Sequence, residues 1–138
     1  MLPCALCHPS NETVLWQDDR CRVILVGDPD YPGFCRVIWS EHIKEMTDLN
    51  ELERARLLAV VFATETVLRR LLHPDKINLA SLGNQLPHLH WHVIPRFTDD
   101  AHFPDPIWAK RRREVSRSLS DGVSLAGELT RLLADQLD

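Results

Sequence analysis

Residues 83–96 have the sequence GNQLPHLHWHVIPR, which predicts a polar turn over 83–87 and a strand over 88–95. Side chains on a strand alternate between its two faces, so three imidazoles share one face, spaced ~6.7 Å apart along the strand. These are His88, His90 and His92. The intervening Leu89, Trp91 and Val93 are apolar and should pack under a helix. Three imidazoles on one face are not a core pattern, so this strand is the candidate functional site.

Two kinds of chemistry fit such a row of imidazoles. Imidazole is the commonest metal ligand, and alternating histidines on a strand can hold one ion. Imidazole can also act as a nucleophile that forms a covalent intermediate. The spacing alone leaves both interpretations open.

The flanking sequence predicts the rest of an α+β domain. Segments 13–16 and 21–26 are rich in β-branched residues and predict a hairpin, followed by a loop over 27–33. Further strands are expected at 34–39 and 76–82, an irregular segment at 97–116, and a C-terminal helix around leucines 125, 129, 132 and 133. Strands, one long helix and more strands fit an antiparallel sheet of about five strands, with one long helix packed on it and a C-terminal helix.

The long helix is expected over Glu51–Leu72. Asn50 and Glu53 form a capping box at its start, and His73-Pro74 ends it. Its apolar arc is wide for a helix packed on one side only. The helix is therefore either deeply packed or in part a dimer face.

Length and composition restrict the class of protein. The 138 residues predict one domain, with a motif core over about 1–96 and a C-terminal extension over 97–138. A net charge of −4 argues against a general nucleic-acid coat, which would carry a basic face. Because there is no signal-peptide pattern and no apolar stretch of ~20 residues, we expect a cytoplasmic protein without a membrane partner.

The wider pattern resembles the histidine triad (HIT) superfamily. His-Leu-His-Trp-His-Val-Ile, residues 88–94, matches the family signature His-φ-His-φ-His-φ-φ, where φ is apolar. Residues 32–42, PGFCRVIWSEH, are similar to the family's Pro-Gly-His-x-Leu-Val-Ile-Pro-Lys-x-His segment. The resemblance covers about residues 1–96 and implies a HIT-like fold.

The resemblance also implies a reaction. The central histidine of the triad, here His90, would attack the α-phosphorus of a purine nucleotide conjugate and expel the group beyond it. Water or another acceptor would then take the nucleotide from the nucleotidyl-histidine, releasing AMP or a similar product. His88 and His92 match family positions that contact phosphate or orient the site. Phosphoramidates and dinucleoside polyphosphates are among the family's substrates, and the leaving group is not readable from this sequence.

The resemblance assigns five further residues to nucleotide binding: Asp28, Asn78, Asn84, Gln85 and Trp108. Asp28 would accept hydrogen bonds from the ribose, with Asp30 as its alternative. Gln85 stands where the family has a serine or threonine, so the leaving-group preference is open. Trp108 would stack on a base, or would simply belong to the core.

Cys4 and Cys7 form a Cys-x-x-Cys pair near the N-terminus. A redox role would need a βαβ unit behind the pair, and none is predicted. Some branches of the family use such a pair for structural zinc, and the resemblance then makes His42 and His88 the other two ligands. The alternative is a reduced pair without metal. No organic cofactor is expected.

Three functions remain open from the sequence. The first is a nucleotide hydrolase or transferase that acts as a homodimer. The second is a nucleotide-binding regulatory module without catalysis. The third is a metalloenzyme that holds one ion with the triad.

Overall fold

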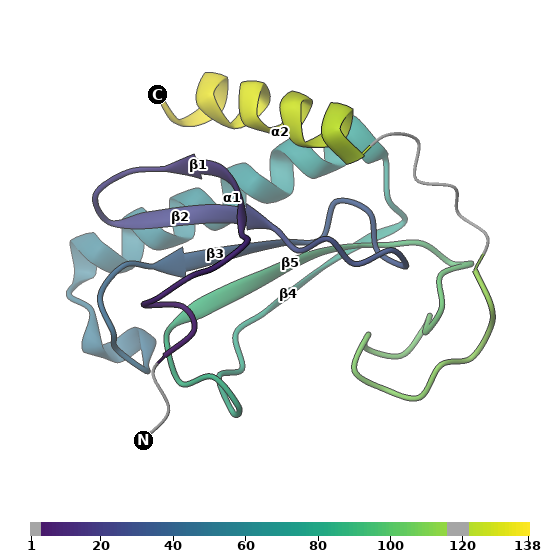
Figure 1. The fold of residues 1–138 in the computed structure, drawn as a ribbon, viewed down its shortest axis with the longest axis horizontal. Helices are drawn as coiled ribbons and strands as arrows, with labels where there is room; N and C mark the ends of the chain where they lie inside the picture. The colour runs from purple at the N-terminus through teal and green to yellow at the C-terminus, as the bar shows by residue number, and fades with distance from the viewer. Residues whose placement is uncertain (1–3, 116–121) are drawn as a thin grey trace.

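The computed structural model describes residues 4–115 and 122–138 and contains one five-stranded sheet with two long helices (Figure 1). The strands are β1 (Thr13–Gln17), β2 (Cys21–Leu25), β3 (Cys35–Trp39), β4 (Lys76–Ala80) and β5 (His90–Arg96). The helices are α1 (Glu51–Leu72) and α2 (Gly122–Leu137), with a short 3₁₀ turn, η1, at Met46–Asp48. The sequence predicted the α+β class and every element except η1.

The sheet is antiparallel throughout, in the order β1-β2-β3-β5-β4. The candidate strand β5 therefore lies between β3 and β4, away from both edges. In the β3–β5 register, Arg36 faces His92 and Ile38 faces His90. Side chains of directly paired residues lie on the same face of a sheet. The two histidines thus share their face with Arg36.

The helices cover the opposite face of the sheet, as Figure 1 shows. Val37 and Val93 point to that side and pack in one buried core with Leu57 and Val60 of α1 and Leu129 of α2. Leu89 is buried in the same core, and Trp91 packs against it. The predicted packing of this side of the strand under a helix is therefore confirmed, and it leaves the imidazole face free for chemistry.

Helix α1 has the predicted bounds because its ends are determined locally. The Asn50 side chain accepts a hydrogen bond from the Glu53 N–H, and the Glu53 side chain accepts one from the Asn50 N–H, both at 2.9 Å. At the other end His73 adopts a left-handed conformation, with φ of 49°. These two caps satisfy backbone groups that a helix leaves unpaired.

Strand β5 starts two residues later than the sequence predicts. The Leu89 N–H donates to the Ile43 carbonyl at 2.7 Å, and its carbonyl accepts from the Trp39 N–H. These bonds tie residues 88–89 to the segment that follows β3. His88 is therefore not the first residue of the strand, and the expectation of three histidines on one regular strand is corrected to two. Strand β4 also ends earlier than predicted, at Ala80.

The segment after β5 is organised by a buried ion pair. The Arg96 guanidinium donates to both carboxylate oxygens of Asp100, at 2.8 and 3.0 Å, and the two side chains are 2% and 1% exposed. Asp100 also accepts hydrogen bonds from the backbone N–H groups of Phe97, His102 and Phe103. One carboxylate thus holds the loop that runs on towards Trp108.

We expect Asp100→Asn to lower the free energy of unfolding by about 3 kcal/mol at pH 7, because it leaves the Arg96 charge buried without its counter-ion. Burial alone would raise the pKa of Asp100, but bonds from Arg96 and the backbone hold that pKa well below its ordinary value of 3.8. A depressed pKa adds stability above the unfolded-state value of ~3.9, and this stability is lost as the pH falls further. Denaturant unfolding of both proteins at pH 7, 5 and 3 should therefore show a difference that shrinks below pH ~4. A difference that is independent of pH would contradict this role.

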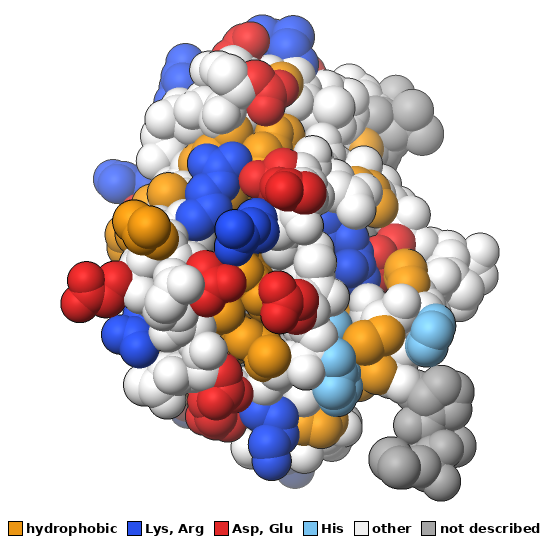
Figure 2. Space-filling view, turned by 90° about the vertical axis from the view of Figure 1, so that its left-hand side faces the viewer, with side chains coloured by type: hydrophobic (Ala, Val, Ile, Leu, Met, Phe, Trp, Pro, Cys, Tyr) orange, Lys and Arg blue, Asp and Glu red, His pale blue; other side chains and the backbone are white. Residues whose placement is uncertain are grey.

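Charged side chains of both signs are interleaved on the face shown in Figure 2. Ion pairs such as Arg20–Glu53 and Arg56–Asp18 join opposite charges across neighbouring elements. Among the described residues, no helix is both long and apolar enough to cross a membrane.

Candidate functional site

The sheet face that carries His90 and His92 opens into a cavity of about 360 Å³. The loop between β4 and β5 supplies one wall, and Trp108, which is 52% exposed, supplies another. The lining residues are Arg36, Leu82, Gly83, Asn84, Gln85, Leu86, His90, His92 and Trp108. Gly83 has a φ of +78°, a conformation that side-chain-bearing residues rarely adopt, so a glycine is favoured at this turn. The cavity is thus built by strands β3 and β5 and two loops.

The backbone determines which nitrogen of His90 is free. Its Nδ1 lies 2.6 Å from the carbonyl oxygen of His88. Because a carbonyl can only accept, Nδ1 must carry the proton and donate. The other nitrogen, Nε2, then holds the lone pair of the neutral ring. Burial lowers the pKa of His90, and Arg36 lowers it further against the opposing effect of the His88 bond, which favours this neutral form near pH 7.

His92 is also a neutral, buried imidazole. Burial, followed by the nearby His90 and Arg36, lowers the pKa of His92 to about 4. Its ring packs edge-on against His90 and against Trp108, with centroids 5.0 Å apart in both pairs. Its buried Nδ1 has no hydrogen-bond partner within the described part of the chain. Because its ring lines the cavity, His92 is positioned to contact a molecule that enters it.

The cavity brings together five of the residues that the sequence analysis selected: His90, His92, Asn84, Gln85 and Trp108. Three others lie elsewhere. The Asp28 carboxylate accepts from the Asp30 N–H within its own loop. The Asn78 side chain accepts from Arg96 at 2.7 Å. Neither these two residues nor His88 lines the cavity.

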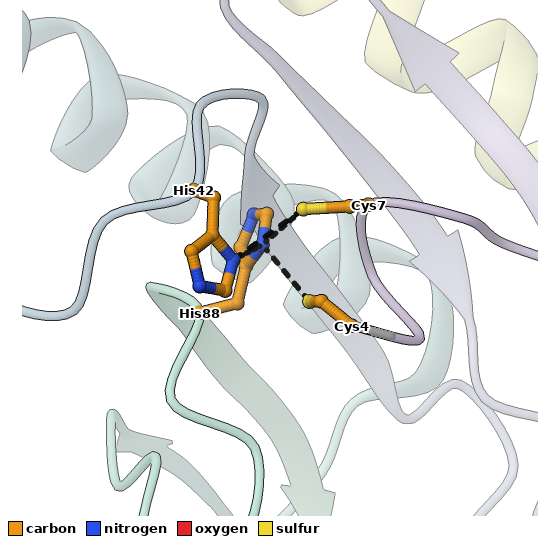
Figure 3. A group of neighbouring side chains, drawn as sticks. All are labelled: Cys4, Cys7, His42 and His88. Atoms are coloured by element: carbon orange, nitrogen blue, oxygen red, sulfur yellow. Dashed lines mark hydrogen bonds between the residues drawn. The ribbon is translucent and has the colours of Figure 1, made fainter. Parts of the chain in front are cut away.

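His88 belongs to a second cluster with Cys4, Cys7 and His42 (Figure 3). Their ligand atoms all lie within 4.8 Å of one another. Nδ1 of His88 is 3.4 Å from each sulfur and 3.3 Å from Nδ1 of His42, and the Cys7 sulfur is 3.4 Å from the same His42 nitrogen. A tetrahedral zinc ion with ordinary bond lengths separates its S and N ligands by roughly 3.3–3.8 Å. The four side chains could therefore hold one tetrahedral metal ion.

The tautomer of His88 is the one that a metal ligand at this site requires. Its Nε2 lies 2.6 Å from the Trp39 carbonyl and must donate to it, so Nδ1 keeps its lone pair and faces the two sulfurs. A ligating histidine typically donates its other N–H to such an acceptor. In residues 4–115 and 122–138 this is the one group of three or more side chains arranged to bind a metal. The three histidines of the triad do not converge on a single ion.

Comparison with known proteins agrees with these observations. The model of the HIT domain matches residues 9–99. This chain belongs to the HIT family. HIT proteins of known structure share its fold: a histidine triad protein from Bradyrhizobium japonicum is 26% identical with a TM-score of 0.77, covering 89% of this chain and 91% of its own. A zinc-bound histidine triad family protein from Mycobacterium smegmatis is 24% identical with a TM-score of 0.66, covering 94% and 89%.

A curated relative from Mycobacterium tuberculosis carries the name AP-4-A phosphorylase. It is 35% identical to this chain over 81 residues, which is 54% of this chain and 42% of the relative. The chain thus matches less than half the length of that relative.

Arg36 is a site residue that the sequence analysis missed. It stands where the HIT pattern has a leucine, in a strand that is otherwise mostly apolar, and the structure places it in the cavity. The sequence signal that could have identified it is a charged residue between the apolar Cys35 and Val37 in a predicted strand. Both neighbours are completely buried in the structure.

None of Cys4, Cys7, Cys21 and Cys35 forms a disulfide. Cys21 and Cys35 lie in the core, and burial raises the pKa of each thiol to about 12. They therefore remain protonated and take no part in the Cys4–Cys7 cluster.

Proposed function

We propose that this HIT protein is a nucleotide hydrolase or transferase acting at the α-phosphate of a purine nucleotide conjugate. The observation that carries the proposal is the bond from His90 Nδ1–H to the His88 carbonyl, which leaves Nε2 unprotonated in a histidine that lines the cavity. A neutral imidazole is nucleophilic near pH 7. The relative named AP-4-A phosphorylase supports the same class of reaction.

In the proposed first step, the Nε2 lone pair of His90 forms a bond to the α-phosphorus. The bond from phosphorus to the leaving group breaks, and the leaving group departs with that electron pair. In the second step, water or another acceptor attacks the nucleotidyl-histidine and restores His90. Water as the acceptor releases AMP and a proton. Dividing one displacement into two lowers each barrier.

The remaining cavity residues would position the substrate. We assign His92 to the phosphate, since its ring lines the cavity and packs against His90. Asn84 and Gln85 are exposed on the loop that lines the cavity and can donate amide hydrogens to the leaving group. Trp108 would stack on the base, because half of its surface is free. His88 acts through its carbonyl, as a positioning residue.

We further propose that Cys4, Cys7, His42 and His88 hold a structural zinc ion. The donor set suits tetrahedral zinc, with four of its six donor separations at 3.3–3.4 Å and all within 4.8 Å, and a zinc-bound relative with the same fold supports the assignment. Zinc would join the N-terminal segment to the residue whose carbonyl orients His90. It would supply no reaction step.

Two alternative functions make different demands. A nucleotide-binding module without catalysis would bind AMP but turn over no conjugate. A metalloenzyme using the triad would need the three rings to meet at one ion, and His88 faces the cysteine cluster instead. The direct test is AMP release from adenosine 5′-phosphoramidate and from diadenosine polyphosphates. Release from either compound supports the enzyme, whereas AMP binding without release supports the binding module.

We propose that two copies of this chain form a homodimer. Strand β4 is an outer strand of the sheet, and its Leu79 is 36% exposed, while Phe62 on α1 is 53% exposed. An exposed apolar edge strand favours pairing with another chain. We expect light scattering to give twice the chain mass for the wild type and the single mass for Leu79→Lys. A wild-type protein that remains monomeric at micromolar concentration would contradict the dimer.

A further inference from the structure

Arg36 is a cationic side chain in the wall of the cavity, and its position is determined by the sheet. It is the second residue of β3 and is directly paired with His92 across the β3–β5 register. It therefore projects from the same face as His90 and His92. Its guanidinium carbon lies 5.9 Å from the centroid of the Phe34 ring, which supports it from one side.

The charge of Arg36 lacks an anionic partner among the described residues. Most other guanidinium groups of the structure form ion pairs. These pairs are Arg20–Glu53, Arg22–Glu12, Arg56–Asp18, Arg96–Asp100, Arg111–Asp30, Arg112–Asp105 and Arg131–Asp135. Glu12 influences Arg36 electrostatically, but both of its carboxylate oxygens already bind Arg22, at 2.8 and 2.9 Å.

Part of the guanidinium is also removed from water. Arg36 as a whole is half-buried, and its Nε is buried without a hydrogen-bond acceptor in the described part of the chain. Leaving a charged donor unpaired in a partly buried site costs free energy. An anion that binds beside the guanidinium offsets part of this free-energy cost through its attraction to the positive charge.

We propose that Arg36 binds a phosphate oxygen of the nucleotide substrate and makes binding at this site depend on the phosphate rather than on the nucleoside. This inference rests on the proposed function and extends it by naming the group that recognises the phosphate. The planar fork of a guanidinium matches two phosphate oxygens at once, which an ammonium group cannot do. The ring of His92, which is paired with Arg36, lines the same cavity beside it.

The experiment compares the binding of AMP and adenosine, two ligands that differ only in the phosphate. Calorimetric titration would use the wild type, Arg36→Met, Arg36→Lys and the control Arg70→Met, an exposed arginine of α1. We expect Arg36→Met to weaken AMP binding roughly 10- to 100-fold, as for a lost charged hydrogen bond, and to leave adenosine binding within about twofold. Arg36→Lys should recover part of the loss, and Arg70→Met should bind both ligands as the wild type does.

Several outcomes would overturn the inference. Equal weakening of AMP and adenosine would indicate that Arg36 contacts the nucleoside or maintains the fold, and thermal melting of each variant separates these two cases. An Arg36→Met protein that binds AMP as the wild type does, or a wild type that does not prefer AMP to adenosine, would also overturn it. If Arg36→Met does not fold, the same comparison is made with Arg36→Lys and Arg36→Gln.

Turnover distinguishes this inference from the proposed function. If the wild type releases no AMP from any conjugate but binds AMP through Arg36, the proposed reaction fails and the inference stands. If the wild type releases AMP while Arg36→Met binds AMP unchanged, the reaction stands and the inference fails.

Discussion

Replacing His90 by alanine should reduce AMP release by roughly 10³-fold or more, because the variant has no imidazole to form the covalent intermediate. The fold should survive, since the side chain faces the cavity and the neighbouring core is built from the other face of β5. AMP release from adenosine 5′-phosphoramidate, followed by chromatography, measures the change. Binding of AMP itself should be much less affected, because the phosphate keeps its other contacts.

A matched control is available at His73, an exposed histidine at the end of α1. His73→Asn should keep full activity, since asparagine tolerates the left-handed conformation of that residue. A sharper variant is His90→Gly with added imidazole, which can restore a nucleophile to the vacated space. Substantial AMP release by His90→Ala would remove His90 from the reaction.

Replacing Cys4 or Cys7 by serine should remove the metal that we propose for the second cluster. We expect one zinc per chain in the wild type by elemental analysis and close to none in Cys4→Ser or Cys7→Ser. If free zinc exceeds its dissociation constant a thousandfold, its loss lowers the free energy of unfolding by about 4 kcal/mol, and the melting temperature should fall by about 10 °C or more.

Two further variants make this test specific. Cys21→Ala removes a cysteine of the core and should leave the zinc content unchanged, although it lowers stability. His90→Ala should also keep its zinc. Loss of the metal from His90→Ala together with retention in Cys4→Ser would instead place the ion in the triad.

Much of this fold could be predicted from the sequence because the deciding signals are local. The ends of α1 follow from the Asn50–Glu53 capping box and from the Pro74 that prevents continuation of the helix. The strands follow from β-branched runs and from alternation along β5. Alternation along the strand places His90 and His92 on one face, and their proposed roles also needed the resemblance to the HIT signature.

The remaining features depend on contacts between distant segments. His88 leaves the strand because residue 89 bonds to Ile43 and Trp39, some 46 and 50 positions earlier in the chain. The alternation rule contains no information about such bonds. Arg36 becomes a site residue only when β3 and β5 are placed side by side, so its role follows from strand order. Asn78, which the resemblance assigns to a nucleotide contact, accepts a hydrogen bond from Arg96 through its side-chain oxygen, a pairing that the sequence does not predict.

The loop that runs from Asp100 to Trp108 has a consequence for how this protein could diversify. His90, the proposed nucleophile, lies on an inner strand of the sheet. Trp108, in another wall of the cavity, lies on a loop that Arg96 and Asp100 attach to the end of that strand. Loops tolerate substitution and changes of length better than inner strands do. Natural variation or laboratory selection confined to residues beyond the ion pair can thus alter which molecules are accepted. His90, which we propose attacks the α-phosphorus, would remain unchanged.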